Sequence, residues 1–170
     1  MNVAPMITIQ HLEMLDPTSI TPSSVEREDL RLMKVDPPDG ARNKWFYVQV
    51  GQKWRWTDRL PWSDQVWSEY ANRPDIETWY ARCNDQTIGY CELCKQPEGS
   101  VQIAYFGLLP ERIGEGWGRH FLTMITQQAW TVPNTRRVWL HTCSDDHPHA
   151  LANYQARGFR VFKVEEFPVT

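Results

Sequence analysis

The chain has 170 residues, of which 41% are hydrophobic, so it is about one domain long and can bury a core without disulfides. Its formal net charge of -3, with both signs interspersed, produces no positive field, and we expect neither nucleic acid nor a membrane as partner. Because it shows neither a bilayer-spanning apolar run nor a cleavable leader, we expect a cytoplasmic protein.

The N-terminal part contains few periodic segments. We expect a strand at residues 7–15 and a short helix at residues 24–33, which begins with a serine followed by acids. Ser63 is a candidate N-cap for a helix that ends before Pro74. Between these segments the chain is rich in tryptophan, which indicates a large apolar cluster: Trp45, Trp54, Trp56, Trp62 and Trp67.

The second part has a regular order of elements. Short strands separated by turn residues are predicted at residues 77–83, 87–95 and 101–109, and they indicate an antiparallel meander. A helix (119–130), a strand (136–143), a helix (147–158) and a last strand (159–166) are expected to follow. This order predicts one α/β domain with a mixed, mostly antiparallel sheet flanked by helices.

The sequence GEGWG, with Gly114, Gly116 and Gly118 alternating, lies between a predicted strand and the predicted helix at 119–130. Glycines let the backbone approach a ligand closely, and the start of a helix presents free N–H groups to a phosphate. The spacing differs from GxGxxG, and the Lys-Ser/Thr pair of a nucleoside-triphosphate loop is absent. Taken alone, the stretch could also be a tight turn packed on the sheet.

Two stretches together, LLPERIGEGWGRHFL and ALANYQARGF, resemble the signature regions of the GNAT superfamily of acyl-CoA N-acyltransferases. The matching positions are Leu108, Pro110, Gly116 and Gly118 in the first stretch, and Ala150, Tyr154, Gly158 and Phe159 in the second. The resemblance extends from about residue 78 to residue 162. Two positions depart from the pattern: Ile113 replaces an Arg or Gln, and His147 replaces an Asn.

The resemblance implies that acetyl-CoA binds to residues 76–166 as co-substrate, while residues 1–75 form the acceptor side. Its binding residues would be Phe106, Gly107, Leu108, Ile113, Gly114, Glu115, Gly116, Trp117, Gly118 and Arg119, with Arg112 at the rim and Tyr154 at the sulfur. The family's chemistry is direct attack of an amine on the thioester. Leu108 N–H would bind the oxyanion and Tyr154 would protonate the leaving thiolate, although its ring could instead simply pack under the helix.

The acceptor side is less clearly defined. Glu92, the only acid in its predicted strand, is a candidate base, but a solvated strand face would explain it equally well. Trp54, Trp56 and Trp62 fall where the family builds its acceptor site and are candidate substrate contacts, with core packing as the alternative. His141 is a further candidate, and Asp146 is a secondary candidate for the proton path.

Two clusters could suggest a metal, and we expect none. Cys91 and Cys94 form a CxxC within a predicted strand, where their side chains should point to opposite faces. The segment from His141 to His149 gathers histidines and aspartates, but Ser144, Asp145 or Asp146 at a helix start are natural caps.

The function expected from the sequence is transfer of an acetyl group from acetyl-CoA to a primary amine of an unidentified small molecule or peptide. A catalytically silent acyl-CoA-binding module used in regulation is the alternative. The family usually covers its last strand with one more, which residues after Phe167 are too few to supply. An uncovered edge at residues 159–166 would favour a homodimer.

Overall fold

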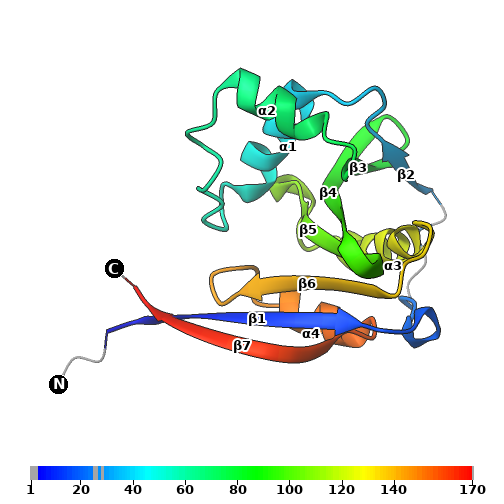
Figure 1. The fold of residues 1–170 in the computed structure, drawn as a ribbon, viewed down its shortest axis with the longest axis vertical. Coiled ribbons are helices and arrows are strands. Elements are labelled where there is room, and N and C mark those ends of the chain that lie inside the picture. Colours follow the sequence, from blue (N-terminus) through cyan, green and yellow to red (C-terminus); the bar gives the residue numbers. More distant parts are fainter. Residues whose placement is uncertain (1–3, 25–26, 28, 170) are drawn as a thin grey trace.

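A seven-stranded sheet organises the chain in the computed structural model, which describes residues 4–24, 27 and 29–169 (Figure 1). The strand order is β2-β3-β4-β5-β6-β1-β7, and only β5 and β6 run parallel. The strands are β1 (Met6–Met14), β2 (Leu30–Lys34), β3 (Ile76–Cys83), β4 (Gln86–Gln96), β5 (Ser100–Leu108), β6 (Arg137–Cys143) and β7 (Arg160–Pro168). The helices are α1 (Gly40–Gly51), α2 (Asp64–Ala71), α3 (Trp117–Trp130) and α4 (Ala150–Ala156). The predicted mixed α/β fold is confirmed.

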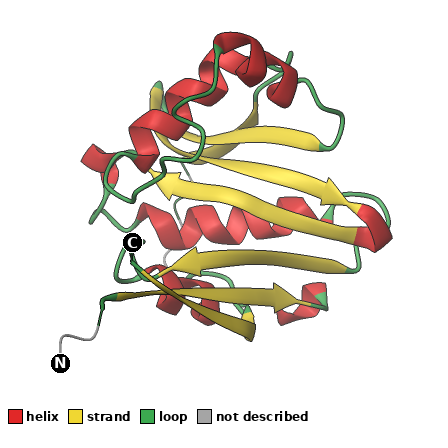
Figure 2. Cartoon of the chain, turned by 60° about the vertical axis from the view of Figure 1, so that its left-hand side comes forward, coloured by secondary structure: helices red, strands yellow, loops and turns green. Residues whose placement is uncertain are grey.

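Each face of the sheet carries its own apolar core and its own helices (Figure 2). On one face, α3 buries Phe121, Leu122 and Ile125 against strand residues, and Tyr154 of α4 joins this core. On the other face, α1 and α2 bury Phe46, Tyr47, Val50 and Trp67. Burial of such side chains contributes about 1.5–3 kcal/mol each, so both helix layers are held mainly by apolar packing.

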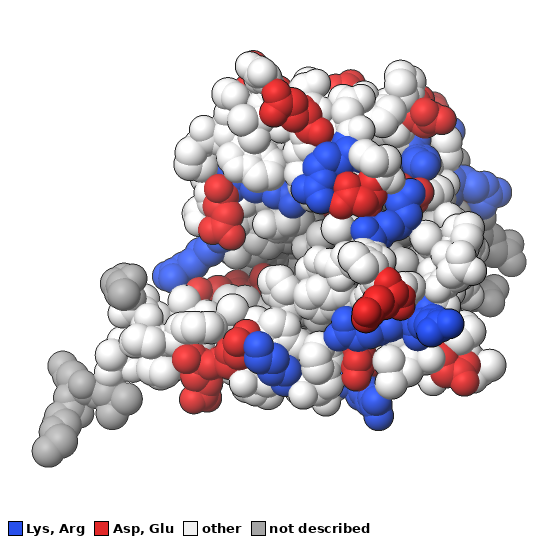
Figure 3. All heavy atoms as spheres, in the orientation of Figure 1, with Lys and Arg blue, Asp and Glu red and all other residues white. Residues whose placement is uncertain are grey.

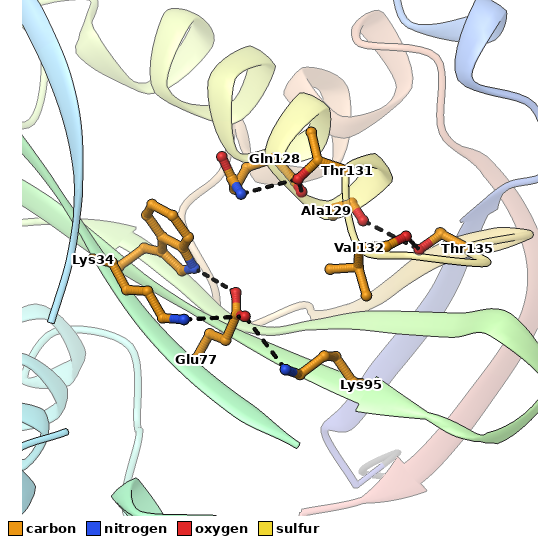
Figure 4. Close-up of polar contacts among 9 residues, drawn as sticks. Lys34, Glu77, Lys95, Gln128, Ala129, Thr131, Val132 and Thr135 are labelled. Carbon is orange, nitrogen blue, oxygen red and sulfur yellow. Dashed lines mark hydrogen bonds and ion pairs between the residues drawn. The ribbon is translucent and has the colours of Figure 1, made fainter. Parts of the chain in front are cut away.

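The meander β3-β4-β5 forms as predicted, and polar contacts of Glu77 join β3 to its two neighbours, β2 and β4 (Figure 4). The Glu77 carboxylate of β3 lies 3.3 Å from the amine of Lys34 on β2 and 3.4 Å from that of Lys95 on β4. It also accepts a hydrogen bond of 3.0 Å from the Trp79 ring. Figure 4 also shows the end of α3, where the Thr131 hydroxyl donates to the Gln128 carbonyl.

The prediction of a helix at residues 24–33 is wrong at its C-terminal end, because Leu30–Lys34 is strand β2 and pairs with β3. Leu30 is buried on the sheet, so pairing with β3 overrides the local helical signal. Residues 25, 26 and 28 lie outside the described part. Helix α1 was not predicted, although Asp39 caps it by accepting from two backbone N–H groups.

The helix expected at residues 147–158 is shorter, because α4 begins at Ala150 and has His149 at its N-cap position. The expected capping role of Ser144, Asp145 or Asp146 is therefore wrong. Asp146 instead closes the turn after β6 by accepting from the Cys143 N–H (2.8 Å) and the Thr142 hydroxyl (2.7 Å). Gly158, with a φ of +110°, ends the helix as predicted.

The N-terminal strand β1 lies between β6 and β7 and pairs antiparallel with both (Figure 1). One edge of β7 is covered by β1, and the expectation of an uncovered edge on the last strand is confirmed for its other edge. The other edge of β7 ends the sheet and has no strand partner among the described residues. Phe162, Val164 and Phe167 of this strand are exposed.

The two parallel strands separate soon after they begin, and this separation positions the site. The ladder between β5 and β6 runs only from Ser100 to Gln102 on β5. A register shift follows between β4 and β5, where Leu93 pairs with Ile103 but Glu92 pairs with Tyr105. The later part of β5 therefore has one backbone edge free of ladder partners, and the surface is hollowed between the two halves of the molecule (Figure 3).

Candidate active site

The glycine-rich turn forms the N-terminal end of α3. Gly114 and Gly116 have φ values of +88° and +82°, a region that side chains rarely adopt, so the turn depends on glycine there. Gly116 is the N-cap and provides no side-chain cap for the first N–H groups of the helix. A Cβ added at Gly116 would meet only the Arg27 guanidinium at 3.8 Å. The turn is thus open, with unpaired donors at the positive end of the helix dipole.

Side chains next to the glycine turn hold it in place and pair with the carboxylate of Glu115. The Trp117 ring donates a hydrogen bond of 2.7 Å to the Glu115 carboxylate, which also lies 3.7 Å from Arg112. The Arg27 guanidinium stacks 4.1 Å from the Trp117 ring and donates to the carbonyl of Glu115. These contacts compensate the negative charge of Glu115 and add positive charge near the free N–H groups, which favours binding of an anion.

Three segments that are distant in sequence meet at this turn. A Cβ on Gly118 would lie 3.7 Å from Leu108 at the end of β5 and 4.0 Å from the Asn153 amide of α4. Phe106 of β5 packs on Phe121 of α3 at 4.8 Å between ring centroids. The structure therefore brings the predicted residues of β5, the glycine turn and α4 together near the opening where β5 separates from β6, which is called the groove below.

The end of β5 directs backbone donors into that groove. The N–H of Leu109 donates to the carbonyl of Ile88 on β4, at 2.9 Å. Because the N–H groups of successive strand residues point to opposite sides, that of Leu108 points toward β6. Beyond Gln102 the β5-β6 ladder has ended, so this donor faces the opening between the two strands.

Tyr154 lies at the buried end of the groove, with 8% of its surface exposed. Its ring centroid is 6.3 Å from Phe106 and 6.4 Å from Phe159. Burial raises the pKa of its phenol well above the usual range, and Asp146 and Cys91 add to the shift. The phenol therefore stays protonated at neutral pH and can donate a proton, while its ring also packs in the core.

Two polar residues were not singled out from the sequence: Asn153 in α4, which is half-buried, and Arg157 at its C-cap, which is buried. The amide of Asn153 donates to the carbonyl of Gly118 at 3.4 Å, while its side-chain oxygen is buried without a partner. Arg157, one turn further along, is 8% exposed and has Nε and one Nη unpartnered. Burial lowers the pKa of Arg157, as does Arg119 nearby. Their spacing by four residues on α4 was the available signal, since such residues share a helix face.

The candidate base Glu92 is fully buried on the face covered by α1 and α2. Both of its oxygens lie 2.9 Å from Nη1 of Arg59. The hydroxyls of Tyr70 (2.7 Å) and Tyr90 (2.8 Å) also donate to it. Burial alone would lower the pKa of Arg59, but the Glu92 carboxylate raises it, so the guanidinium is charged. Glu92 is therefore engaged by an internal cation.

The candidate acceptor residues lie at different places. Trp56 packs on Tyr105 of β5, at 4.8 Å between centroids, and Trp54 contacts His147 at 5.3 Å. Trp62 lies over the Arg59 guanidinium at 4.9 Å and lines a separate surface pocket of about 480 Å³. His141 is exposed on β6, at 5.7 Å from the ring of His11.

The two clusters considered for a metal remain separate. Cys91 is buried, whereas Cys94 lies on the opposite face beside Asp75, and all four cysteines are free. Within residues 4–24, 27 and 29–169, no group of three or more His, Cys, Asp or Glu side chains is placed to hold a metal ion. None of the helices in that part is long and apolar enough to cross a membrane.

Comparisons with known proteins agree with this arrangement. A GCN5-related N-acetyltransferase from Sphaerobacter thermophilus matches with a TM-score of 0.69 and 14% identity, over 96% of this chain and 52% of that one. One from Kribbella flavida matches with a TM-score of 0.63 and 18% identity, over 92% and 56%. The present chain thus spans little more than half the length of these two proteins.

A third similar structure is of comparable length. Spermidine N-acetyltransferase from Vibrio cholerae, in complex with CoA and spermine, matches with a TM-score of 0.64 and 18% identity, over 79% of this chain and 82% of that one. At such identities the likeness shows the fold alone. A search of curated proteins finds no match. The model of the acetyltransferase (GNAT) family, however, matches residues 43–159, more than half of the sequence, and the chain therefore belongs to that family.

Proposed function

We propose that the protein transfers the acetyl group of acetyl-CoA directly to a primary amine. The observation that carries this proposal is the meeting of the glycine turn, the free edge of β5 and Tyr154 around one groove. The residues fit CoA chemically, since the turn offers unpaired donors, Asn153 of α4 adds an unpartnered side-chain oxygen, and Arg157 at the C-cap adds two unpartnered nitrogens.

Each segment has a distinct task in the proposed reaction. The N–H groups at residues 114–119 and the nearby arginines bind the pyrophosphate, and the edge of β5 holds the pantetheine arm. The Ile113 N–H instead donates to the Pro110 carbonyl, at 3.3 Å. Acetyl-CoA supplies an activated acyl group, so no acyl-enzyme is required. The Leu108 N–H stabilises charge on the thioester oxygen, and the Tyr154 hydroxyl gives its proton to the departing thiolate.

The proposed aromatic contacts of the acceptor are Trp56, which packs on Tyr105, and Trp54, which contacts His147; together they are called the aromatic wall, on the opposite side of the sheet from α3. Aromatic faces attract ammonium groups, which suits an amine that arrives protonated. In this proposal the role of Glu92 is structural: it is paired with Arg59, whose guanidinium lies 4.4 Å from the ring of Tyr105, on which Trp56 packs.

The direct test is incubation with acetyl-CoA and a panel of amines, amino acids, peptides and polyamines, including spermidine, while thiol release is followed. Release that depends on one class of amine supports the proposal. CoA binding by calorimetry without thiol release from any acceptor would instead favour the silent acyl-CoA-binding module.

Substitutions at the glycines test the CoA groove. Gly116→Val fills the open side of the turn, and Gly118→Ala adds a methyl between Leu108 and Asn153 at ordinary contact distance. We expect each to weaken CoA binding by about tenfold or more, about 1.4 kcal/mol. Gly118→Ala should not destabilise the helix, since alanine is favoured over glycine there by about 1 kcal/mol.

The matched control is Asn84→Val, which places a β-branched residue at a φ of +53° in the β3-β4 turn. It introduces backbone strain like that of Gly116→Val without touching the groove. Unchanged CoA affinity in both glycine variants, with both proteins folded, would move the pyrophosphate site elsewhere.

A further inference from the structure

A polar cluster lies on the open face of β6, β1 and β7, and its members come from both ends of the chain. Val138, Leu140 and Thr142 of β6 are buried. Because side chains alternate along a strand, His141 points to the opposite face, the one that carries α1 and α2 further along the sheet. The pairing of β1 with β6 places His11 directly opposite His141.

The cluster has the contacts of a proton-transfer site. Nε2 of His11 lies 2.7 Å from a carboxylate oxygen of Glu165 on β7. The rings of His11 and His141 are 5.7 Å apart between centroids, a separation that one water can bridge. His141 is exposed, and the Glu165 side chain is 33% exposed, so both ends of the cluster are in contact with solvent.

The segment between α1 and α2 reaches over this end of β6. Arg55 forms an ion pair of 3.3 Å with Asp145, and Trp54 contacts His147, both in the segment that follows β6. The proposed aromatic wall for the acceptor is thereby tied to the strand that carries His141. An ammonium group held by Trp54 would thus lie on the face of the sheet to which His141 points.

A protonated amine cannot attack a thioester until it loses a proton, and Glu92 is already bonded to Arg59, Tyr70 and Tyr90. We propose that His141 accepts this proton and that the His11–Glu165 pair passes it to solvent. The inference rests on the proposed acetyl transfer.

The proton balance is complete without another reactant. The ammonium N–H bond breaks and its proton moves to a ring nitrogen of His141, which leaves the lone pair on the amine. That lone pair forms the N–C bond as the C–S bond breaks. The thiolate takes the Tyr154 proton, and the phenolate is reprotonated by the second proton that the amide nitrogen loses. One proton in all is released, through His11 and Glu165.

The charges around His141 give the cluster a characteristic pH response. Burial of part of the ring lowers the pKa of His141, and His11 lowers it further, whereas Asp146 and Glu165 raise it. Lys163 lies 2.8 Å from Glu165 and, with His11, keeps the pKa of that carboxyl below its usual range. His141 is therefore neutral at pH 7 and able to accept a proton.

The experiment combines turnover with imidazole titration by NMR. His141→Asn should lower kcat/KM by about 10²-fold or more with CoA affinity unchanged, and the acidic limb of the pH profile should disappear. His11→Asn should lower turnover and move the pKa of His141 upward, since His11 depresses it. Glu165→Gln should move that pKa downward. His149→Asn, in an exposed histidine outside the cluster, is the control and should change none of these.

The outcomes separate the two proposals. If no amine gives thiol release, acetyl transfer fails, while the opposite shifts of the His141 titration still report whether the cluster is coupled. If transfer occurs but His141→Asn retains its turnover and acidic limb, the proton path is overturned and the proposed function stands. If the pKa of His141 shifted equally in His11→Asn and Glu165→Gln, the proton path would also be overturned.

Discussion

The buried pair of Arg59 and Glu92 gives the most informative prediction, because a structural role and a catalytic role for Glu92 differ in what they disturb. Arg59 comes from the segment between α1 and α2, and its side chain is 9% exposed, while that of Glu92 is 0% exposed. Five aromatic rings surround the guanidinium carbon within 6 Å: Tyr47, Trp62, Trp67, Tyr70 and Tyr105. Water cannot replace either partner there without repacking.

Arg59→Met keeps much of the side-chain volume but leaves the Glu92 carboxylate buried beside only two hydroxyl donors. Breaking a buried ion pair in this way costs about 3–5 kcal/mol. For a chain of this length, that corresponds to a drop of about 6–20 °C in the thermal midpoint. Glu92→Gln should cost a similar amount, because it leaves the Arg59 guanidinium unpaired.

The double variant with both substitutions is the matched control. A glutamine at position 92 can still bond to Tyr70 and Tyr90, and no charge remains buried. We expect it to be more stable than either single variant, with a coupling energy of about 1–3 kcal/mol in a thermodynamic cycle. Chemical denaturation followed by far-ultraviolet circular dichroism measures all four proteins.

Turnover measured well below the midpoint completes the test. If the role of Glu92 is structural, turnover should fall only as far as the fraction of folded protein falls. The reasoning is refuted if Arg59→Met changes the free energy of unfolding by less than about 1 kcal/mol. It is equally refuted if Glu92→Gln is stable and loses about 10²-fold in kcat at every pH, which would make Glu92 the base.

Three further predictions concern the site, the sheet and the assembly. Tyr154→Phe should lower kcat by about 10²-fold while CoA affinity changes little. Because burial raises the pKa of this phenol, the pH profile of wild-type activity should show no alkaline limb from Tyr154 below about pH 10. Equal turnover of the two proteins would assign Tyr154 to packing alone. Burial favours a higher pKa for Glu77, but Trp79 and Lys34 lower that pKa below its usual range. The contribution of Glu77 to stability should therefore be complete above its pKa in the unfolded chain and fall as the pH drops through its pKa in the folded protein. The wild type should lose stability in acid relative to Glu77→Gln, and parallel curves of unfolding free energy against pH would contradict this. Because the outer edge of β7 has no strand partner in the described part of the chain, we predict a homodimer by light scattering at micromolar concentration. The fluorescence of Trp54, Trp56 and Trp62, assigned by single Trp→Phe variants, should respond to the acceptor but not to dilution. A monomeric mass, or a signal that follows dilution alone, would be the contrary result.

Local chemistry was sufficient to predict the second half of the chain. The meander, α3 and the glycine turn follow from alternation, helical spacing and turn residues that act over a few positions, and Gly114 and Gly116 do adopt the backbone angles that require glycine. The family could be inferred for the same reason, because both of its signature stretches are continuous in sequence. The sequence pattern was weaker in the first half, where β2 was predicted as helix and α1 was missed.

Contacts between distant segments were decided by the tertiary structure. Strand β1 was predicted as a strand, but its insertion between β6 and β7, which puts His11 opposite His141, depends on pairing across more than 120 residues. The pair of Glu92 and Arg59 is a second example of a contact that the sequence alone does not predict. The sequence shows an acid in a strand and an arginine in a loop, and only the packing of α1 and α2 on the sheet buries the two charges together. Periodicity reports which face a residue occupies, but the partner that determines its chemistry is set by how whole elements pack.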